Sequence, residues 1–413
     1  MKSFVDMERR SWKLARELEK LMRKHRPRWS IPVILLRAGA RDPKLRAGLL
    51  QLVDVFPSLS THDEIRGHFL MYIWPFKDKL PLHMRLASYG MKAPLINRLG
   101  TMAIRWAVTK KLAPYFIVSD ERMLSRLKES YSKDGTGIVL DFLGELVVSH
   151  AEADHFFGKY LEAMRQAPGV HIAVKFSSLF PYFSPENYEE SIARVGERFE
   201  DILRVARKTD SFVTVDAEHY DFRNLIEDIF CQTLLKPEFR DFPSVGIALQ
   251  AYLVESMSSA SRFVEVGKTR GVPFSVRLVK GAYWDTEMAL ARQRSWLPAV
   301  FTSKHNTDYR FKQLIYFLFR NWKHVHVSPA THNPESIAFA YKTAEEVGVL
   351  RDPSFEFQVL YGLGEPIRKA LRSKGLSVSA YVPVGDLDTG MSYFARRILE
   401  NTANEGVLLR LIS

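Results

Sequence analysis

PFSVRLVKGAYWD, residues 273–285, is a β-type run that ends at a glycine and passes directly to two large aromatic side chains and an acid. A glycine at the end of a strand usually marks a close approach of the backbone to other backbone or to a ligand. Lys280 precedes this glycine, Gly281, and Arg277 lies three residues before the lysine. Two cations beside an aromatic pair suit a flat, electron-rich, anionic cofactor. A strand that simply ends at a glycine and packs an aromatic side chain into the core is the alternative interpretation.

Seven further β-rich runs surround this one, and helical stretches such as SPENYEESIARVGERFEDILRVARK separate them. The eight runs are GIVLDFL (137–143), VHIAVKFSS (170–178), SFVTVDAE (211–218), SVGIALQAYL (244–253), PFSVRLVKGAY (273–283), VHVSPATHN (325–333), PSFEFQVLYG (353–362) and LSVSAYVPVG (376–385). Eight repeats of strand and helix predict an α/β fold, a (β/α)8 TIM-type barrel of about 280 residues. A doubly wound open sheet is the rival fold, but the sequence lacks the GxGxxG fingerprint that such a fold carries after its first strand.

The first third of the chain has a different sequence pattern, which is helical and basic. Residues 1–134 are expected to form a basic α-helical N-terminal arm, and residues 135–413 the barrel, because stretches such as DMERRSWKLARELEKLMRKH and APLINRLGTMAIRWAVTKKL are amphipathic at helical spacing. Residues 1–134 hold 27 Lys and Arg against 13 Asp and Glu, a net charge of +14, and the remainder holds 32 against 34, a net charge of −2. This asymmetry predicts attraction to an acidic surface, although a solvated helical arm is the alternative.

Composition excludes several classes of protein. A single cysteine, Cys231, leaves no internal disulfide framework and fits a reducing compartment. Its place in the helical stretch NLIEDIFCQTLL predicts a buried, inert thiol. The charged N-terminus does not resemble a secretory signal, and no apolar run reaches a membrane-spanning length. We therefore expect a cytoplasmic protein that contacts at most the inner face of a membrane peripherally.

Polar or charged residues fall at the carboxyl ends of the eight predicted strands, where barrel active sites form. They are, in order, Glu145, Lys175, Asp216, Gln250, Arg277 with Lys280-Gly281-Ala282, Thr331-His332-Asn333, Gln358 with Leu360, and Tyr381. Packing does not explain such a set, because a barrel interior prefers Val, Ile and Leu. A Schiff-base lysine at position 175 or 280 would need a desolvated amine, which the neighbouring charges do not evidently supply. His324 and His326 start the sixth strand, at the wrong end for a catalytic metal, so no metal site is predicted.

The last predicted helix, TGMSYFARRILENT, carries two faces. Met391, Phe394, Ile398 and Leu399 form an apolar face at helical spacing. Beside it lies a polar stripe of Tyr393, Arg396, Arg397 and Glu400. An exposed, ion-paired helix is one interpretation, but paired arginines suit a bidentate grip on a carboxylate. If the helix lies over the barrel mouth, the arginines face whatever binds above the strand ends.

Together these residues resemble the proline dehydrogenase family, flavoenzymes that oxidise L-proline to Δ1-pyrroline-5-carboxylate in a (β/α)8 barrel. The matching motifs are LGE (143–145), VKFSS (174–178), VDAE (215–218), QAY (250–252), RLVKGAYWD (277–285), THN (331–333), FQVLYGLGEP (357–366), YVPVG (381–385) and YFARRILENTAN (393–404). DPKLRAGLLQLVDVFPSL is similar to the helical region before the barrel in bifunctional proline utilisation A enzymes. Their aldehyde dehydrogenase half and their DNA-binding segment have no counterpart here, so no nucleic-acid binding is expected.

The resemblance implies roles for individual residues. Asp216 and Arg277 would be catalytic, with Arg277 against the flavin near its reactive nitrogen. The FAD-binding set would be Ala217, Gln250, Arg277, Val279, Lys280, Gly281, Ala282, Trp284, Thr302, Lys304, Thr331, His332, Asn333, Gln358 and Leu360. The L-proline-binding set would be Lys175, Asp216, Tyr283, Tyr381, Arg396 and Arg397. Glu145 and Glu400 would gate the site.

The family resemblance also implies partners. Electrons would pass from FAD to a quinone, so peripheral contact with a membrane through the basic N-terminal region is expected. The product would pass to a separate pyrroline-5-carboxylate dehydrogenase. Two other classes of function remain open at this point: another TIM-barrel enzyme, either a Schiff-base aldolase or a metal-dependent hydrolase, and a membrane-associated scaffold without catalysis.

Overall fold

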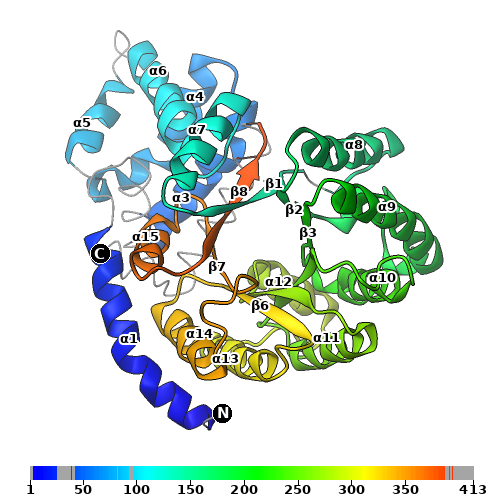
Figure 1. The fold of residues 1–413 in the computed structure, drawn as a ribbon. Helices are drawn as coiled ribbons and strands as arrows, with labels where there is room; N and C mark the ends of the chain where they lie inside the picture. Colours follow the sequence, from blue (N-terminus) through cyan, green and yellow to red (C-terminus); the bar gives the residue numbers. More distant parts are fainter. Residues whose placement is uncertain are drawn as a thin grey trace.

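The computed structural model describes residues 3–25, 39, 42–80, 82–92, 97–144, 146–386, 390 and 393. Eight parallel strands form a closed barrel in which each strand pairs with its neighbour in sequence and the first pairs with the last (Figure 1). The strands are β1 (Gly137–Phe142), β2 (His171–Val174), β3 (Phe212–Val215), β4 (Val245–Gln250), β5 (Phe274–Val279), β6 (Val325–Ala330), β7 (Phe357–Leu360) and β8 (Val378–Val384). The predicted (β/α)8 fold is therefore confirmed.

The barrel strands are short and almost wholly buried, because side chains fill the interior and helices cover the outside. β4 is buried at every position. β5 pairs with β6 over six consecutive positions, from Phe274 opposite Val325 to Val279 opposite Ala330. A slip of one residue would exchange the interior and exterior faces, so this register decides which side chains reach the barrel mouth.

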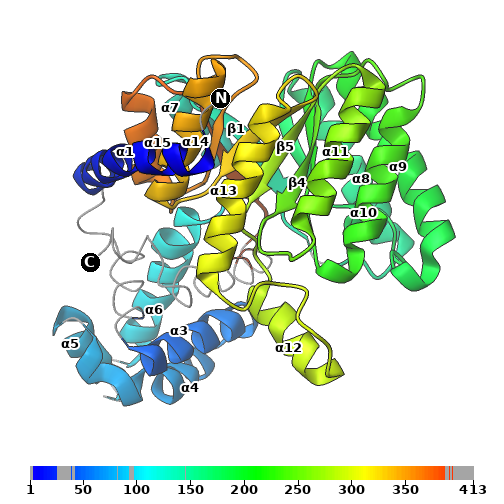
Figure 2. The same cartoon turned by 90° about the horizontal axis from the view of Figure 1, so that it is seen from below.

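A ring of helices surrounds the barrel. They are α8 (His150–Gln166), α9 (Tyr188–Lys208), α10 (Arg223–Leu235), α11 (Ser256–Arg270), α12 (Trp284–Arg294), α13 (Lys304–Arg320), α14 (Pro334–Val347) and α15 (Glu365–Ser373). Two helices, α12 and α13, occupy the connection between β5 and β6, and α12 projects from the carboxyl end of the barrel (Figure 2). Cys231 is buried in α10, and burial raises the pKa of its thiol to about 12, as expected for an inert thiol.

The N-terminal helix α1 (Phe4–Lys24) packs on the outside of the barrel, across α14 and α15 (Figures 1 and 2). Its apolar face, which includes Met7, Leu14, Leu18 and Met22, is buried in the main hydrophobic core. Charged contacts also hold the N-terminal half of this helix. Arg10 pairs with Glu346 at 2.7 Å, and Lys312 on α13 pairs with Glu8 at 2.7 Å. The first helix is therefore part of the outer layer of the barrel.

The helices that follow α1 gather at the carboxyl end of the barrel, on the side from which α12 projects (Figure 2). They are α3 (Pro43–Val55), α4 (His62–Tyr72), α5 (Leu82–Gly90) and α6 (Asn97–Ala107), joined in part by short 3-10 turns. The last helix before the barrel, α7 (Glu121–Ser132), packs against β1 instead. Val118, between α6 and α7, donates its backbone N–H to the Pro383 carbonyl at 2.8 Å. The predicted helical character of the N-terminal region is confirmed, and the structure adds its position over the end of β8.

Two further findings concern the predicted membrane and helix-face assignments. Within the described ranges, no helix combines the length and the apolar character needed to cross a bilayer. Tyr393 is buried in an apolar cluster with Phe116, Ile117 and Leu363, so its assignment to a polar stripe was wrong. Amphipathic spacing places tyrosine equally well on either face of a helix, since its ring is apolar and only its tip is polar.

Candidate active site

Side chains from several strands converge on one carboxylate at the carboxyl end of the barrel. Asp216, which follows β3, accepts hydrogen bonds from Arg277 Nη1 and from Tyr381 Oη, the latter at 2.6 Å. Lys175 Nζ, which follows β2, lies 3.8 Å from Asp216 Oδ2. Asp141 of β1 accepts a hydrogen bond from the same ammonium group. The register therefore brings together Lys175, Asp216, Arg277 and Tyr381, all named from the sequence, and adds Asp141.

The charges in this cluster are held by burial and by one another. Burial alone would lower the pKa of Lys175, but Asp141 and Asp216 raise that pKa above its usual value. Burial, with the same two carboxylates, raises the pKa of Tyr381 well above its usual value. At neutral pH, Lys175 is therefore an ammonium ion and Tyr381 keeps its phenolic proton. The guanidinium of Arg277 also lies 4.8 Å from the centroid of the Tyr381 ring, which orients both groups.

Several buried polar atoms at the mouth have no partner among the described residues. Arg277 is only 4% exposed and uses Nη1 for Asp216, whereas its Nε and Nη2 make no hydrogen bond. Gln358 donates through Nε2 to Glu356 at 2.7 Å, and its Oε1 accepts none. Buried donors and acceptors are almost always paired in proteins, so these atoms point to a bound molecule. A flavin, whose pyrimidine edge carries both an N–H donor and carbonyl acceptors, fits this mixture.

The backbone after β5 comes unusually close to a neighbouring ring. Gly281 has φ +126°, which side-chain-bearing residues rarely adopt. A Cβ atom at this position would lie 2.5 Å from the ring of Tyr252. The glycine is therefore required by both the conformation and the space, as the strand-end pattern suggested. The adjoining predicted cofactor positions Val279, Lys280, Ala282 and Trp284 are half-buried along the same loop.

Lys280 points outward from this loop toward α13. Its ammonium pairs with Asp308, whose second oxygen accepts from Lys304 Nζ at 3.0 Å. Burial lowers the pKa of Lys280 to about 8, despite the opposing effect of Asp308. The expectation that no lysine here would be desolvated was therefore wrong. The burial of Lys280 arises from tertiary packing, which the adjacent residues in the sequence do not reveal. Two cations share one carboxylate, which leaves an excess positive charge suited to an anion.

A cofactor of this kind would also meet polar groups after β4 and β6. Gln250 Nε2 donates to the Glu218 carbonyl at 3.2 Å and to Tyr252 Oη at 3.4 Å. His332 Nε2 accepts a hydrogen bond from the Leu360 N–H at 3.1 Å, which ties the ends of β6 and β7 together. These contacts hold three of the predicted residues, Gln250, His332 and Leu360, at the barrel mouth.

The sequence profile described as proline dehydrogenase matches residues 124–410, more than half of the chain. The chain belongs to the proline dehydrogenase family. A second profile, described as the proline utilization A N-terminal domain, matches residues 6–116. The family assignment made from the sequence motifs is confirmed, and the predicted activity agrees with it. The family is one of flavoenzymes, which accords with the unpaired atoms of Arg277 and Gln358.

Named relatives fall into two groups. Proline dehydrogenase 1 of Bacillus subtilis is 30% identical over 68% of this chain and 83% of its own length. The bifunctional protein PutA of Escherichia coli is 28% identical over 66% of this chain, but over only 22% of its own length. The crystal structure of PutA from Bdellovibrio bacteriovorus inactivated by N-propargylglycine superposes with a TM-score of 0.85 at 29% identity, covering 97% of this chain and 42% of that one. The chain thus spans about a fifth of the length of the bifunctional curated relatives.

The other predicted site residues occupy varied positions. Trp284 Nε1 donates to the Phe301 carbonyl at 2.9 Å, and Thr302, the next residue, is exposed. The Tyr283 ring lies on His219, with 4.2 Å between ring centroids. Ala217 is half-buried directly after Asp216. Four predicted residues lie outside the described residues: Glu145, Arg396, Arg397 and Glu400.

Thr331 and Asn333 shape the start of α14. The Asn333 N–H donates to Thr331 Oγ1 at 3.2 Å. Asn333 Oδ1 in turn accepts from the N–H groups of Glu335 and Ser336, at 2.8 and 3.2 Å, and so caps the helix. The THN motif therefore stabilises the start of α14, in addition to any contact with a cofactor.

Sequence reasoning missed several acidic residues of the site. Asp141 contacts Lys175, Asp308 links Lys280 to Lys304, and Glu218 accepts hydrogen bonds from Ser177. Burial raises the pKa of the Glu218 carboxyl. The sequence did contain a signal for Asp141, because it is an acid inside the apolar run GIVLDFL. An unpaired charge is energetically costly inside a barrel, so such an acid indicates a charged partner. Its partner could not be read from the sequence, because it lies on another strand.

Proposed function

We propose that this chain oxidises L-proline to Δ1-pyrroline-5-carboxylate with FAD as its cofactor, and that a quinone accepts the electrons. The observation that carries the proposal is the buried Asp216 cluster at the barrel mouth, with a charged lysine, an arginine and a protonated tyrosine around one carboxylate. Family membership supports the same reaction. FAD, when bound, supplies the acceptor for the hydride that leaves the substrate carbon.

The residues of the chain would bind and orient the substrate. Lys175, held charged by two carboxylates, would attract the proline carboxylate, together with Arg396 and Arg397. Tyr283 and Tyr381 would form the walls of the pocket. Asp216 positions the cations, so that the substrate meets an ordered, charged surface and the reaction becomes effectively intramolecular. Glu145 and Glu400 would close the site from above.

The FAD would lie along the strand ends from β4 to β7. Arg277 and Gln358 would pair their free buried atoms with its ring, and Lys280 and Lys304 would hold the pyrophosphate. Gly281 would let the backbone approach. The other members of the FAD-binding set are Ala217, Gln250, Val279, Ala282, Trp284, Thr302, Thr331, His332, Asn333 and Leu360. We retain the division into a helical region, 1–134, and a barrel, 135–413, with the last helix over the mouth, as part of this proposal.

The activity is tested by turnover of the full chain with L-proline and a soluble quinone analogue, with Δ1-pyrroline-5-carboxylate measured as the product. We expect reduction of the quinone that depends on both proline and FAD, with product in equal amount. A protein that contains FAD and forms no pyrroline product from proline would exclude the proposal. A Schiff-base reaction at Lys280 is not proposed, because Asp308 already binds that ammonium group.

The affinity of the apoprotein for FAD should fall as the pH rises. The pKa of Lys280 is about 8, so its amine is charged below that pH and neutral above it. Because a pyrophosphate favours the charged form, the attraction is fully present well below pH 8 and is lost as the pH rises through about 8. We expect the Kd for FAD, measured by flavin fluorescence, to rise roughly tenfold between pH 7 and 9. A Lys280→Met variant should bind more weakly, with a Kd nearly independent of pH; an equally steep dependence in that variant would contradict this account.

Peripheral membrane contact is supported by a surface of α5 and α6. Leu82, Leu86 and Tyr89 follow helical spacing on α5, and Leu99, Met102 and Trp106 do so on α6; all six are more than half exposed. We call these six residues the α5–α6 apolar surface. Lys77 and Lys92 lie over the Trp74 ring beside it, and Lys111 lies over Trp106. Exposed apolar side chains at helical spacing, with cations beside them, are typical of helices that lie in a membrane interface.

Binding of the protein to lipid vesicles tests this surface. We expect cosedimentation with vesicles that contain anionic lipid at low salt, and weaker binding at high salt. A Leu86→Glu, Leu99→Glu double variant should lose most of the binding. Leu297→Glu is the control, since Leu297 is 94% exposed but lies after α12, outside the apolar surface. No cosedimentation of the unaltered protein at low salt would refute membrane contact through this surface.

A further inference from the structure

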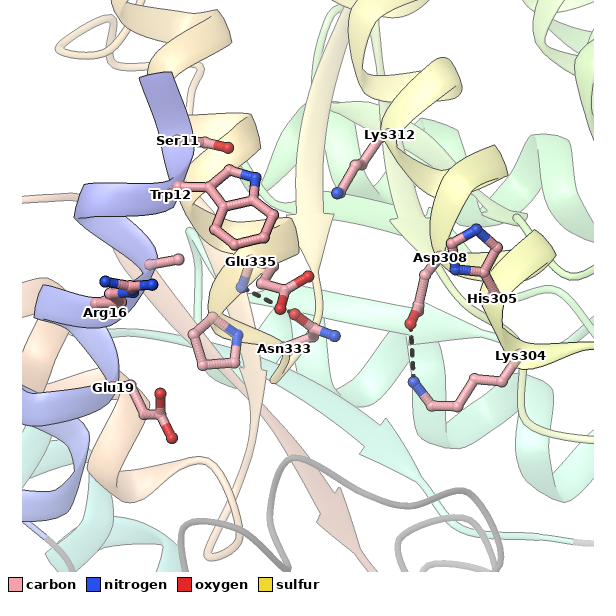
Figure 3. Close-up of a pocket in the computed structure, with 12 residues that line it drawn as sticks. Ser11, Trp12, Arg16, Glu19, Lys304, His305, Asp308, Lys312, Asn333 and Glu335 are labelled. Carbon is pink, nitrogen blue, oxygen red and sulfur yellow. Dashed lines mark hydrogen bonds and ion pairs between the residues drawn. The ribbon is translucent and has the colours of Figure 1, made fainter. Parts of the chain in front are cut away.

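A cavity of about 400 Å³ opens between α1, α13 and the start of α14 (Figure 3). Trp12, Arg16 and Glu19 line it from α1, and Asn333 and Glu335 line it from the beginning of α14. On the opposite side, α13 contributes polar side chains, three of them charged. They are Lys304, His305, Asp308 and Lys312. The cavity has the size of a small-molecule site.

One carboxylate links this cavity to the loop after β5. Asp308 lines the cavity, pairs with Lys280 at the barrel mouth, and also accepts from Lys304. Lys280 and Lys304 are the residues proposed to hold the pyrophosphate of FAD. A dinucleotide whose ring lies over β5 would therefore direct its other half into this space.

The two sides of the cavity differ in chemistry. The α13 side presents Lys304 at a helix N-terminus, which favours phosphate groups. The other side presents the Trp12 indole ring and the Glu19 carboxylate from α1, and the Glu335 carboxylate from α14 (Figure 3). An aromatic face suits a purine base, and carboxylates accept hydrogen bonds from ribose hydroxyl groups. Phosphates on one side and a nucleoside on the other match the adenosine diphosphate part of FAD.

Packing of α1 does not require Trp12. The helix is fixed by its buried apolar face and by the Arg10–Glu346 and Glu8–Lys312 pairs. Trp12 lies off that face, and 63% of its surface is exposed. An exposed tryptophan on a firmly held helix, at the edge of a cavity, is a preformed stacking surface for a ligand.

We propose that α1 forms the adenosine-binding wall of the cofactor site, with Trp12 against the adenine and Arg16 beside the ribose and phosphate groups. The inference rests on the proposed binding of FAD and assigns the N-terminal helix, outside the barrel sequence, a part in holding it. The wall would retain FAD in preference to FMN, which lacks the adenosine half. The chain would thereby select its cofactor through a helix more than 250 residues before the RLVKGAYWD motif (277–285) in sequence.

The test compares the affinities of two flavins for the full-length apoprotein. Flavin fluorescence titrations would give the Kd for FAD and for FMN in the unaltered protein and in Trp12→Ala. We expect Trp12→Ala to weaken FAD about tenfold and to leave FMN within twofold. Trp106→Ala is the matched control: Trp106 is also exposed but lies on α6, away from the cavity, so both affinities should be unchanged.

The outcomes separate this inference from the function on which it rests. Equal FAD affinity in Trp12→Ala and the unaltered protein overturns the adenosine wall while leaving the flavin site intact. A parallel loss of FAD and FMN affinity also overturns it, since it would show a general disturbance of the barrel. Failure of the unaltered protein to bind either flavin would instead refute the proposed function. ADP offers an independent readout, because it should compete with FAD in the unaltered protein and about tenfold less effectively in Trp12→Ala.

Discussion

Asp216→Ala is expected to produce the largest loss of both stability and activity among single substitutions at the barrel mouth. The change removes the carboxylate that Arg277 and Tyr381 bind and that lies 3.8 Å from Lys175 Nζ. Arg277, which is 4% exposed, would then be a buried cation with no partner among the described residues. Removing one member of a buried ion pair costs about 3–5 kcal/mol. Chemical denaturation should show a loss of that size, and proline should no longer reduce the flavin at a measurable rate.

Two further variants serve as comparisons for the predicted loss of stability. Asp216→Asn keeps the shape and can still accept from Tyr381, so its loss of stability should be smaller than that of Asp216→Ala. Asp221→Ala breaks an exposed pair, in which Arg294 lies 3.1 Å from the carboxylate. Such pairs contribute about 0–1 kcal/mol, so this control should be nearly neutral. Equal free energies of unfolding for Asp216→Ala and Asp221→Ala would contradict the central place of Asp216.

Gly281→Ala is expected to have the second largest effect. The new methyl group would meet the Tyr252 ring at 2.5 Å, at a φ of +126° that alanine rarely adopts. Tyr252 is buried, so its ring has little freedom to move aside. We expect the loop that carries Lys280 to shift, with a loss of about 2–4 kcal/mol in the free energy of unfolding. Purified protein should also contain much less flavin than the unaltered protein.

Gly271→Ala is the matched control for the backbone conformation alone. Gly271 ends α11 at φ +74°, and a Cβ atom there would meet nothing within 4 Å. This variant should therefore lose only about 1–2 kcal/mol, the cost of the left-handed conformation, and should keep its flavin. Full flavin content and near-normal stability in Gly281→Ala would show that the close approach to Tyr252 is not needed.

The barrel was predictable because its signals are local. Runs such as PFSVRLV and SVGIALQ alternate with amphipathic helices, and only a few folds accommodate eight such repeats. The position of α1 was not predictable in the same way. Its amphipathic pattern indicates a buried face, but only the structure shows that α14 and α15 cover that face.

The site was predictable in part for a related reason. Lys175, Asp216, Arg277 and Tyr381 stand at or near strand ends, and a parallel barrel brings such positions to one rim. Asp141, however, lies inside a strand run, and its contact with Lys175 depends on the pairing of β1 with β2. The lowered pKa of Lys280 likewise depends on packing against α13 rather than on adjacent residues. Pairings between elements decide such features, and spacing along the chain does not reveal them.

The most direct test of the account is the absorbance spectrum of the purified protein before and after anaerobic addition of L-proline. We expect an oxidised flavin spectrum that bleaches on addition of proline and does not bleach in the Asp216→Ala variant reconstituted with FAD. A bound flavin that stays oxidised with saturating proline would contradict the proposed substrate. A protein that shows no flavin spectrum, even after incubation with FAD, would contradict the proposed cofactor and with it the central claim.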